Sequence, residues 1–262
     1  MKITILGCGG SAGVPMIGGD EGAGTGLWGV CDPANRRNHR LRSSVVIEHE
    51  GFRLLVDSGP DLRQQMLANG LTHVDAVFYT HAHSDHIGGL DELRAINRVI
   101  GRPLPLLASA DVLAELRQRF DYAFRPWEGG TFYRPSFDVQ EIPDYGPIKV
   151  GPLEGHVFPQ RHGWITSLGV RFGPFAYCTD VESFPERSQV LLHDLSCWVV
   201  GCFQRGEHPS HGWLGRVLEW RQQFRPSHTV LTHMGPDMDY DMLRKELPDD
   251  VRPAWDGMEL SV

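Results

Sequence analysis

Short apolar runs separated by turns set the pattern along this chain, which carries 30 glycines and 18 prolines. These runs have the length and the alternation that are typical of β-strands. In the first half of the chain they predict strands over residues 2–6, 44–48, 52–57, 76–79 and 104–108. In the second half they predict strands over 156–159, 165–172, 176–179 and 229–232, and a buried strand between 190 and 203.

Helical spacing appears between the strands. Leu90, Leu93, Ile96 and Ile100 recur at the interval that places side chains on one face of a helix. Similar patterns predict helices over 61–69, 111–120, 182–189 and 214–224. This mixture predicts an α/β fold. Because 262 residues can bury one core and no linker or repeat interrupts them, we expect a single domain over residues 1–262.

Two stretches lack a clear period. Residues 16–40 form a long irregular segment, and loops of that length are usually functional or disordered. We expect an active-site lid or a dimer contact there. Residues 124–145 are rich in aromatic side chains, which suit a core or a contact between subunits. A homodimer would use one of these two stretches.

Charge and cysteine content narrow the class of protein. The formal charge of −8 argues against a broad basic face that grips nucleic acid. Met1 leads directly into a predicted strand, with no apolar segment of signal-peptide or transmembrane length, so we expect a cytoplasmic protein without a membrane contact. The five cysteines are an odd number and form no CxxC pair, which fits reduced thiols, with Cys197 and Cys202 in the core.

One basic cluster interrupts this acidic chain. The segment NRRNHRLR, residues 35–42, contains Arg36, Arg37, Arg40 and Arg42. Arginine suits bidentate binding of phosphate, which predicts a phosphate contact. A solvated loop whose arginines pair with acidic neighbours explains the same pattern. The sequence leaves both interpretations open.

The stretch 80–89, THAHSDHIGG, carries the strongest chemical signal. His81 and His83 follow a predicted buried strand. Because they are two residues apart on an extended segment, they point the same way and can hold one ion. Asp85 and His86 lie where the chain turns into the next helix and can reach a second ion. Two adjacent cations suit hydrolysis, because together they deprotonate a water molecule and stabilise the displaced oxygen.

HAHSDH is an HxHxDH motif, and it resembles the motif of the metallo-β-lactamase fold superfamily of two-metal hydrolases. The resemblance implies a four-layer αββα sandwich with the metals at one edge of its two sheets. Members of the superfamily act on lactams, thioesters, phosphodiesters and RNA. The substrate class therefore has to come from other residues.

Three further candidate ligands, His162, Asp180 and His233, lie at the ends of predicted strands. Their order resembles that of the third histidine, the bridging carboxylate and the last histidine of the superfamily. The resemblance implies that Asp180 bridges two ions. It assigns His81, His83 and His162 to one ion, and Asp85, His86 and His233 to the other. His156 is the rival of His162, and the strand that follows His162 favours the latter.

The resemblance also implies groups around the metals. A histidine ligand usually donates its other ring nitrogen to a carboxylate, and Asp57 at a strand end is the candidate acceptor. Binding the amides of its own loop is an equally open role for Asp57. A catalytic histidine is expected before a helix, in the segment GEHPSHGW. His211 matches that position, with His208 as its rival, and would protonate the leaving oxygen while a metal-bridging hydroxide attacks.

The opening LGCGGSAGVP, the loop CDPANRRN and the ending WDGMELSV resemble the PhnP-type phosphodiesterases, which open a cyclic ribose phosphate in phosphonate breakdown. The resemblance spans essentially the whole chain and implies a small phosphodiester substrate. Such enzymes can carry a structural zinc bound by closely spaced cysteines. Only Cys31 remains in that loop here, so no structural zinc is expected. For the two catalytic ions we expect manganese or zinc, with iron as a further candidate.

Two other functions compete with this interpretation. The tRNA 3′-processing endonucleases (RNase Z) resemble this chain in the same motif and in the histidine before a helix. The chain shows no inserted arm of glycines and basic residues with which such an enzyme grips tRNA, so nucleic acid is not the expected partner. A metal-binding regulatory module without catalysis is the alternative of another class.

Overall fold

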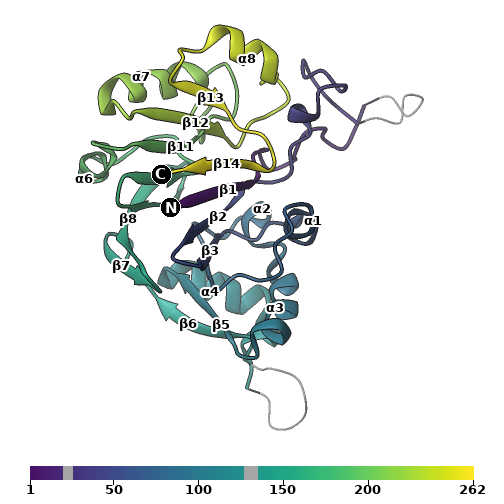
Figure 1. Ribbon diagram of the computed structural model, residues 1–262, viewed down its shortest axis with the longest axis vertical. Coiled ribbons are helices and arrows are strands. Elements are labelled where there is room, and N and C mark those ends of the chain that lie inside the picture. The colour runs from purple at the N-terminus through teal and green to yellow at the C-terminus, as the bar shows by residue number, and fades with distance from the viewer. Residues whose placement is uncertain (20–25, 127–134) are drawn as a thin grey trace.

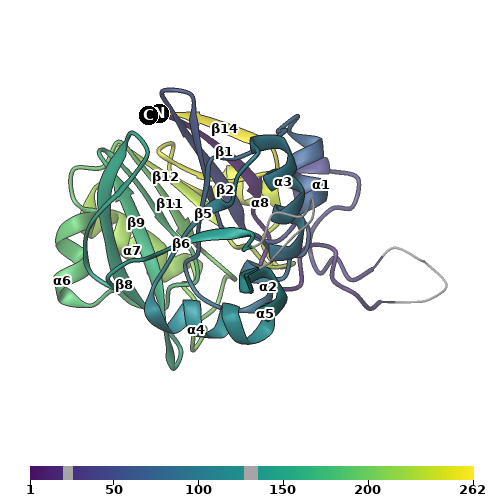
Figure 2. The ribbon, with the colours of Figure 1, turned by 90° about the horizontal axis from the view of Figure 1, so that it is seen from below.

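A computed structural model of the protein describes residues 1–19, 26–126 and 135–262. Two seven-stranded sheets pack face to face, and helices cover their outer faces (Figure 1). Figure 2 shows the molecule from below, with α6 on one side of the strands and α1 and α3 on the other. This arrangement is the four-layer αββα sandwich that the resemblance implies, and it confirms the predicted α/β class.

The first sheet has the strand order β14-β1-β2-β3-β4-β5-β6. Its strands are β1 (Lys2–Gly7), β2 (Ser44–His49), β3 (Phe52–Val56), β4 (Ala76–Phe78), β5 (Leu104–Ala108), β6 (Phe137–Glu141) and β14 (Met258–Ser261). The predicted hairpin is formed by β2 and β3, which pair antiparallel. Strands β3 to β6 are parallel, so their carboxyl ends lie at one edge of the sheet.

The second sheet has the order β13-β12-β11-β10-β9-β8-β7. Its strands are β7 (Gly146–Val150), β8 (Leu153–His162), β9 (Ile165–Phe172), β10 (Phe175–Cys178), β11 (Cys197–Gly201), β12 (His228–Thr232) and β13 (Val251–Pro253). Strands β10 to β13 are parallel, and their carboxyl ends likewise share one edge. Ligand sites in such sheets form outside the carboxyl ends of the strands.

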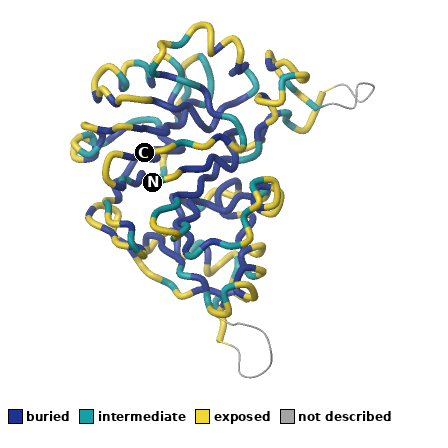
Figure 3. The backbone as a smooth tube through the Cα atoms, in the orientation of Figure 1, coloured by how far each residue is buried: buried dark blue, intermediate teal, exposed yellow. Residues whose placement is uncertain are grey.

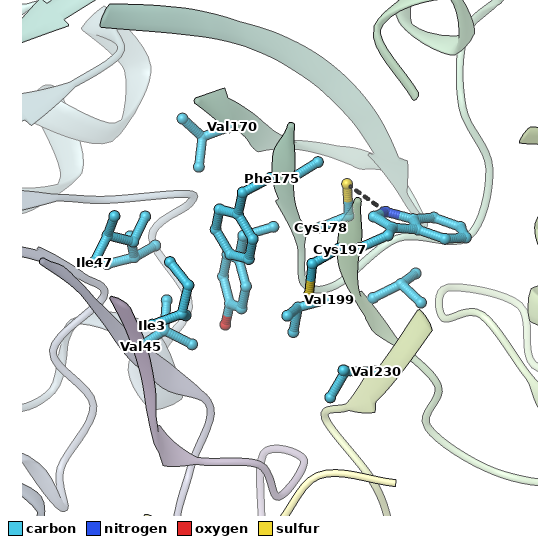
Figure 4. Close-up of a cluster of buried hydrophobic side chains, with 14 of the residues drawn as sticks. Ile3, Val45, Ile47, Val170, Phe175, Cys178, Cys197, Val199 and Val230 are labelled. Carbon is cyan, nitrogen blue, oxygen red and sulfur yellow. Dashed lines mark hydrogen bonds between the residues drawn. The ribbon is translucent and has the colours of Figure 1, made fainter. Parts of the chain in front are cut away.

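The core lies in layers, because alternate residues of a strand point to opposite faces of its sheet. Val45 of β2 packs between the two sheets, whereas its neighbour Val46 packs against the helices. Figure 4 shows Ile3 and Val45 of the first sheet opposite Val170 and Phe175 of the second. The five cysteines are buried and free, as expected for reduced thiols.

Each sheet has its own set of helices. Helices α1 (Leu62–Ala68), α3 (Leu93–Ile100) and α4 (Ala110–Arg119) cover the first sheet, and α6 (Glu186–Gln189), α7 (Leu214–Phe224) and α8 (Tyr240–Glu246) lie on the second. The short elements are α2 (Ser84–Ile87), α5 (Asp121–Phe124), η1 (Arg36–Asn38), η2 (Leu90–Glu92) and η3 (Val190–Leu192). Burial is highest along the strands and lowest on the outer turns of the helices (Figure 3). In the described part of the chain, no helix is long and apolar enough to cross a membrane.

The helix predicted over 182–189 is wrong for its first half. Only Glu186–Gln189 is helical, and Pro185 is its N-cap. A proline restricts the residue before it to extended backbone, so a helix cannot run through this point easily. The amide of Glu182 instead donates to the carbonyl of Arg161 over 2.7 Å. The sequence pattern also missed β6, β7, β13, β14 and α8, which are short and weakly periodic.

The irregular segment 16–40 packs beside the chain that follows His233. The amide of Val30 donates to the carbonyl of Pro236 over 3.0 Å. No described residue of this segment lines the two cavities beside the site, so the described part gives no support to the lid interpretation. The dimer contact stays a prediction. In the aromatic stretch, Phe137 is buried in β6, whereas Trp127, Phe132 and Tyr133 lie outside the described residues.

Candidate metal centre

The predicted ligands come together at the carboxyl edge of both sheets. They form two groups within which the candidate ligand atoms all lie within 4.8 Å of one another. The outer cluster consists of His81, His83, His162 and Asp180, and the inner cluster consists of Asp85, His86, Asp180 and His233. Asp180 belongs to both clusters, which is the placement that a bridging carboxylate requires.

The outer cluster is built around His83, its one exposed member. The Nε2 atoms of His81 and His162 lie 3.1 Å and 3.2 Å from His83 Nδ1. They lie 3.7 Å and 3.5 Å from Asp180 Oδ2. Burial lowers the pKa of both His81 and His83, which favours their neutral rings. A neutral imidazole is the form that binds a metal.

The inner cluster is fully buried and more strongly charged. His86 Nε2 lies 3.3 Å from Asp85 Oδ2 and 3.2 Å from Asp180 Oδ1, and His233 Nδ1 lies 3.0 Å from Asp180 Oδ1. Although burial opposes it, the carboxylates of Asp180, Asp57 and Asp85 hold the pKa of His86 well above its ordinary value. The proton on His86 thus partly offsets negative charge that a cation could neutralise instead.

Unpartnered polar atoms show that these residues fit a metal ion. Asp85 Oδ2, His86 Nε2, Asp180 Oδ2 and His233 Nε2 are buried, and none makes a hydrogen bond. A buried polar atom without a partner costs about 1–3 kcal/mol, so such atoms are rare in a finished core. A divalent cation would satisfy several of them together. Mixed imidazole and carboxylate ligands suit manganese, zinc or iron.

Backbone conformation turns three of the site residues inward at the sheet edge. Asp57, Asp180 and His233 follow the ends of β3, β10 and β12, and their φ angles are +62°, +46° and +55°. Residues other than glycine rarely adopt this left-handed conformation, and those that do cluster at functional sites. Periodicity carries no signal for it, so the sequence pattern did not predict it.

The predicted contact of Asp57 with a histidine is present. Asp57 Oδ2 lies 2.7 Å from His86 Nδ1, which points the Nε2 atom of that ring into the inner cluster. Asp57 Oδ1 also accepts from the amide of Thr80 over 2.8 Å. That amide belongs to the chain after β4 and not to the loop of Asp57, so the alternative role proposed for this carboxylate is not the one observed.

Two supporting contacts were missed by the sequence analysis. The carbonyl of Ser210 lies 2.7 Å from His162 Nδ1, which leaves Nε2 of that ring facing His83. Ser43 Oγ lies 3.1 Å from His233 Nδ1 and donates to the carbonyl of Gly9 over 2.9 Å. Serines are too common in loops for the sequence alone to single these two out.

His211 lies beside the outer cluster, with Nδ1 3.9 Å from Asp180 Oδ2. Its ring stacks on Phe203 at a centroid distance of 4.9 Å. Helix α7 has Trp213 as its N-cap, so His211 does not cap it. His208 lies farther out, 5.0 Å from His211 between ring centroids. Burial, followed by the charge of nearby histidines, lowers the pKa of His211 to about 3.

His156 lies outside both clusters. It is an exposed residue in the middle of β8, where it pairs with Arg171 of β9. His162, at the end of the same strand, is the member of the outer cluster. The choice of His162 over its rival is therefore supported by geometry.

Two arginines of residues 35–42, Arg40 and Arg42, have partners away from the clusters. Arg42 pairs with Asp61 over 3.2 Å. Arg40 is buried and donates to the carbonyls of Gly235 and Met238 over 3.2 Å and 2.5 Å. These contacts favour the interpretation that the segment pairs with its neighbours. One detail of that interpretation is wrong: Arg40 is buried and not solvated, and it binds carbonyls of the chain after His233.

Two cavities lined by residues that the structure describes open beside the outer cluster. One, of about 450 Å³, is lined by His83, His162 and His211 together with Ser11 and Trp164. The other, of about 670 Å³, reaches His81 and His83 from the side of α4 and β9. Both cavities give a small molecule access to the outer cluster, whereas the inner cluster is closed to solvent.

Residues 52–234 match the family described as the beta-lactamase superfamily domain. The chain belongs to the beta-lactamase superfamily. This membership confirms the predicted family and agrees with the expected class of metal-dependent hydrolase.

One curated relative covers nearly the whole chain. The octanoyltransferase of Porphyromonas gingivalis (strain ATCC BAA-308 / W83) is 33% identical over 264 residues, which are 99% of this chain and 51% of that protein. The chain spans about half the length of the curated relatives it matches.

Solved structures share the fold. A structure described as a new diphosphatase from the PhnP family is 30% identical and has a TM-score of 0.88, covering 100% of this chain and 97% of that one. Human tRNase Z, short form, is similar in fold, with 16% identity, a TM-score of 0.70 and coverage of 100% of this chain and 99% of that one.

Proposed function

We propose that residues 1–262 form one hydrolase domain that binds two divalent ions and cleaves a small phosphodiester, with His211 as general acid. One observation carries the proposal. The two clusters share Asp180, and a histidine that belongs to neither cluster lies 3.9 Å from that carboxylate, facing a cavity. A pair of ions and a separate proton donor are the parts that hydrolysis of a diester with a poor leaving group needs.

In this proposal each cluster would hold one ion, and Asp180 would be a ligand of both. Bound together, the ions would supply a deprotonated water and stabilise negative charge on the phosphoryl oxygens. His83 is the member of the outer cluster that lines both cavities, so a substrate would approach the ions from its side. His86 keeps its orientation through Asp57, and the stacking of His211 on Phe203 fixes the ring of the acid.

His211 has to carry a proton when the leaving oxygen departs. Its lowered pKa makes the ring neutral in the free protein at neutral pH. A phosphate anion bound beside the ring raises that pKa, because an opposite charge favours the imidazolium form. Proton donation by His211 therefore requires that substrate binding raise this pKa, and the proton would then move from the ring to the departing alkoxide.

The leaving group separates the proposed diester from a phosphoanhydride. The similar PhnP-family structure is described as a diphosphatase. Cleavage of a diphosphate releases a phosphate, which is a good leaving group and needs no proton. A well-placed histidine at the cavity favours an ester with an alkoxide leaving group. The octanoyl transfer named for the P. gingivalis relative is not carried over, because this chain matches about half of that protein.

Endonuclease action on tRNA is the second candidate, and the similarity to tRNase Z in fold motivates it. The charge of −8 and the pairing of Arg40 and Arg42 within the chain argue against a basic surface for RNA. Cleavage of precursor tRNA at enzyme concentrations that leave cyclic ribose phosphates intact would reverse this ranking.

Turnover of bis(p-nitrophenyl) phosphate tests the proposal. The protein is assayed after loading with manganese, zinc or iron, and two ions per chain are expected by elemental analysis. Absence of turnover with every divalent metal would rule out both enzymes and leave a metal-binding regulatory module. Hydrolysis of a cyclic ribose phosphate would support a place in phosphonate breakdown. We further propose that the protein acts in the cytoplasm and binds no structural zinc; Cys31 Sγ contacts the guanidinium of Arg40 over 3.7 Å.

A further inference from the structure

Trp164 is the fully exposed tryptophan of the described residues, with a relative exposure of 101%. The other described tryptophans are buried or half-buried. Its indole makes no ring contact or hydrogen bond with the described part of the chain. A single exposed apolar side chain is common on protein surfaces, so Trp164 is distinguished by its position beside the outer cluster.

The position of Trp164 ties it to the outer cluster. It lies in the turn between β8 and β9, where His162 pairs with Ile165. Gly163 supplies the left-handed residue of this turn with a φ of +59°. A Cβ atom on Gly163 would lie 3.2 Å from Ser210 Cβ, and His162 Nδ1 lies 2.7 Å from the carbonyl of Ser210. The backbone under the indole is therefore held on the loop that also carries His211.

Trp164 lines both cavities beside the outer cluster. Trp164 and His83 therefore both belong to the wall that a substrate meets, whichever cavity its organic part enters. The cavity with His211 would receive the leaving oxygen, because the proposed acid lies there. A ring attached to the sugar that carries this oxygen would lie against Trp164.

The charges of the larger cavity disfavour a second phosphate. Among the described residues that line it, Asp111, Glu115 and Asp144 are acidic, and the cation there is Arg119. Arg119 already donates to Glu115 over 2.7 Å and to the carbonyl of Ala82 over 2.9 Å. The smaller cavity offers no lysine or arginine in the described part of its lining. A neutral flat ring fits these walls better than a distal phosphate group.

We propose that Trp164 is a specificity-determining residue that stacks on the base of a nucleotide, so that the substrate is a nucleoside phosphodiester without a second phosphate. This inference rests on the proposed phosphodiesterase function. Stacking of a base on an aromatic side chain is sequence-tolerant, because every base has a π-face, and it does not require a base-specific hydrogen bond.

Paired substrates test the inference. Adenosine 2′,3′-cyclic phosphate and methyl β-ribofuranoside 2,3-cyclic phosphate present the same reacting group with and without a base. The wild type should have the lower KM for the adenosine compound. Trp164→Ala should raise that KM roughly 5- to 150-fold, the usual range for loss of one base stack, with kcat nearly unchanged. The KM for the methyl riboside should not change, and Trp164→Phe should retain most of the preference.

Fluorescence gives a readout that needs no turnover. Titration of the metal-free protein with adenosine 2′-monophosphate should quench indole emission in a saturable way, and ribose 5-phosphate should not. Trp164→Phe should lose this quenching. The matched control is Trp255→Phe, which alters a half-buried tryptophan beside Tyr240 and should keep it.

Equal KM values for the two substrates in the wild type, or equal changes in Trp164→Ala, would overturn the inference while diester hydrolysis still stands. Quenching that persists in Trp164→Phe would overturn it as well. If the wild type hydrolyses neither substrate nor bis(p-nitrophenyl) phosphate, the proposed function fails, and the fluorescence titration alone decides the role of Trp164.

Discussion

The outer and inner clusters share Asp180 but differ in burial, charge and support. The outer cluster meets solvent through His83 and adjoins both cavities. Burial already favours the neutral rings of its His81 and His83. In the inner cluster every member is buried, and His86 is held by Asp57 and stays protonated among carboxylates.

This difference shows how one edge of the sandwich can combine a closed site, suited to retaining an ion, with an open site that a substrate can reach. The inner cluster is closed and braced, so it keeps its geometry and suits an ion that stays bound. The outer cluster is open on one side, so an ion bound there would be accessible to a substrate. A closed site has to offset the charge of its own ligands, and the proton on His86 does so in the metal-free protein.

The largest effect is expected from the residue that belongs to both clusters. Asp180→Ala should lose most of the metal from both sites together with activity, because each cluster loses a carboxylate ligand. The loss of rate should exceed the ~10⁴-fold limit of a missing general acid. Elemental analysis measures the metal content, and His83→Ala is the control that should lose ion from the outer cluster only. Two ions per chain retained in Asp180→Ala would remove this residue from the bridging role.

The second largest effect is expected from His211, which lines a cavity beside the outer cluster. His211→Ala should keep both ions and lose roughly 10²- to 10⁴-fold in rate on a ribose cyclic phosphate, which has a poor alkoxide leaving group. The loss on p-nitrophenyl esters should be much smaller, because that leaving group departs without a proton. Steady-state kinetics on both substrates measures the difference.

Equal losses on the two kinds of ester, together with a lowered melting temperature, would contradict the role of His211 as acid. His208→Ala is the matched variant, since it removes the rival imidazole 5.0 Å away from His211 between ring centroids. It should leave both rates close to those of the wild type.

A smaller effect should separate the two clusters directly. Asp57→Asn keeps the size of the side chain but weakens its hold on His86 Nδ1. Loss of such a supporting carboxylate usually lowers metal affinity about 10- to 100-fold. We expect that loss for one ion per chain, the inner one, when the protein is titrated with a metal-sensitive dye as competitor. A uniform loss for both ions would show that Asp57 supports the whole edge.

The smallest effect is a difference in proton release. Below the raised pKa of His86 its ring is protonated in the free protein, so a metal ion must displace that proton to bind the inner cluster. Apparent affinity for this ion should therefore rise with pH until pH passes the pKa of His86. The outer cluster should release fewer protons, because the pKa values of His81 and His83 are lowered.

Calorimetric titration in two buffers of different ionisation enthalpy measures this release. At pH 7 the inner step should release about one proton per chain. The comparison of the clusters would be wrong if both steps release the same number.

Many strands and helices of this protein, and its candidate ligands, could be predicted from the sequence alone. The strands 44–48, 104–108 and 165–172 and the helix 214–224 follow from local periodicity, and the structure has them within a residue or two. The ligand residues could be proposed from the HxHxDH motif and from the resemblance to the superfamily, which matches His162, Asp180 and His233 at the ends of predicted strands. Local periodicity was thus sufficient for the α/β class, whereas the motif and the resemblance supplied the residues that the structure gathers at its edge.

Tertiary structure decided which of these residues meet and what holds them. His162 and not His156 joins the outer cluster, Asp57 binds His86, and Arg40 is buried against the chain after His233. The sequence of the turn does not indicate that Trp164 is exposed and lines two cavities. Such facts depend on contacts between segments far apart in the chain, and on left-handed backbone at strand ends, neither of which leaves a periodic signal in the sequence.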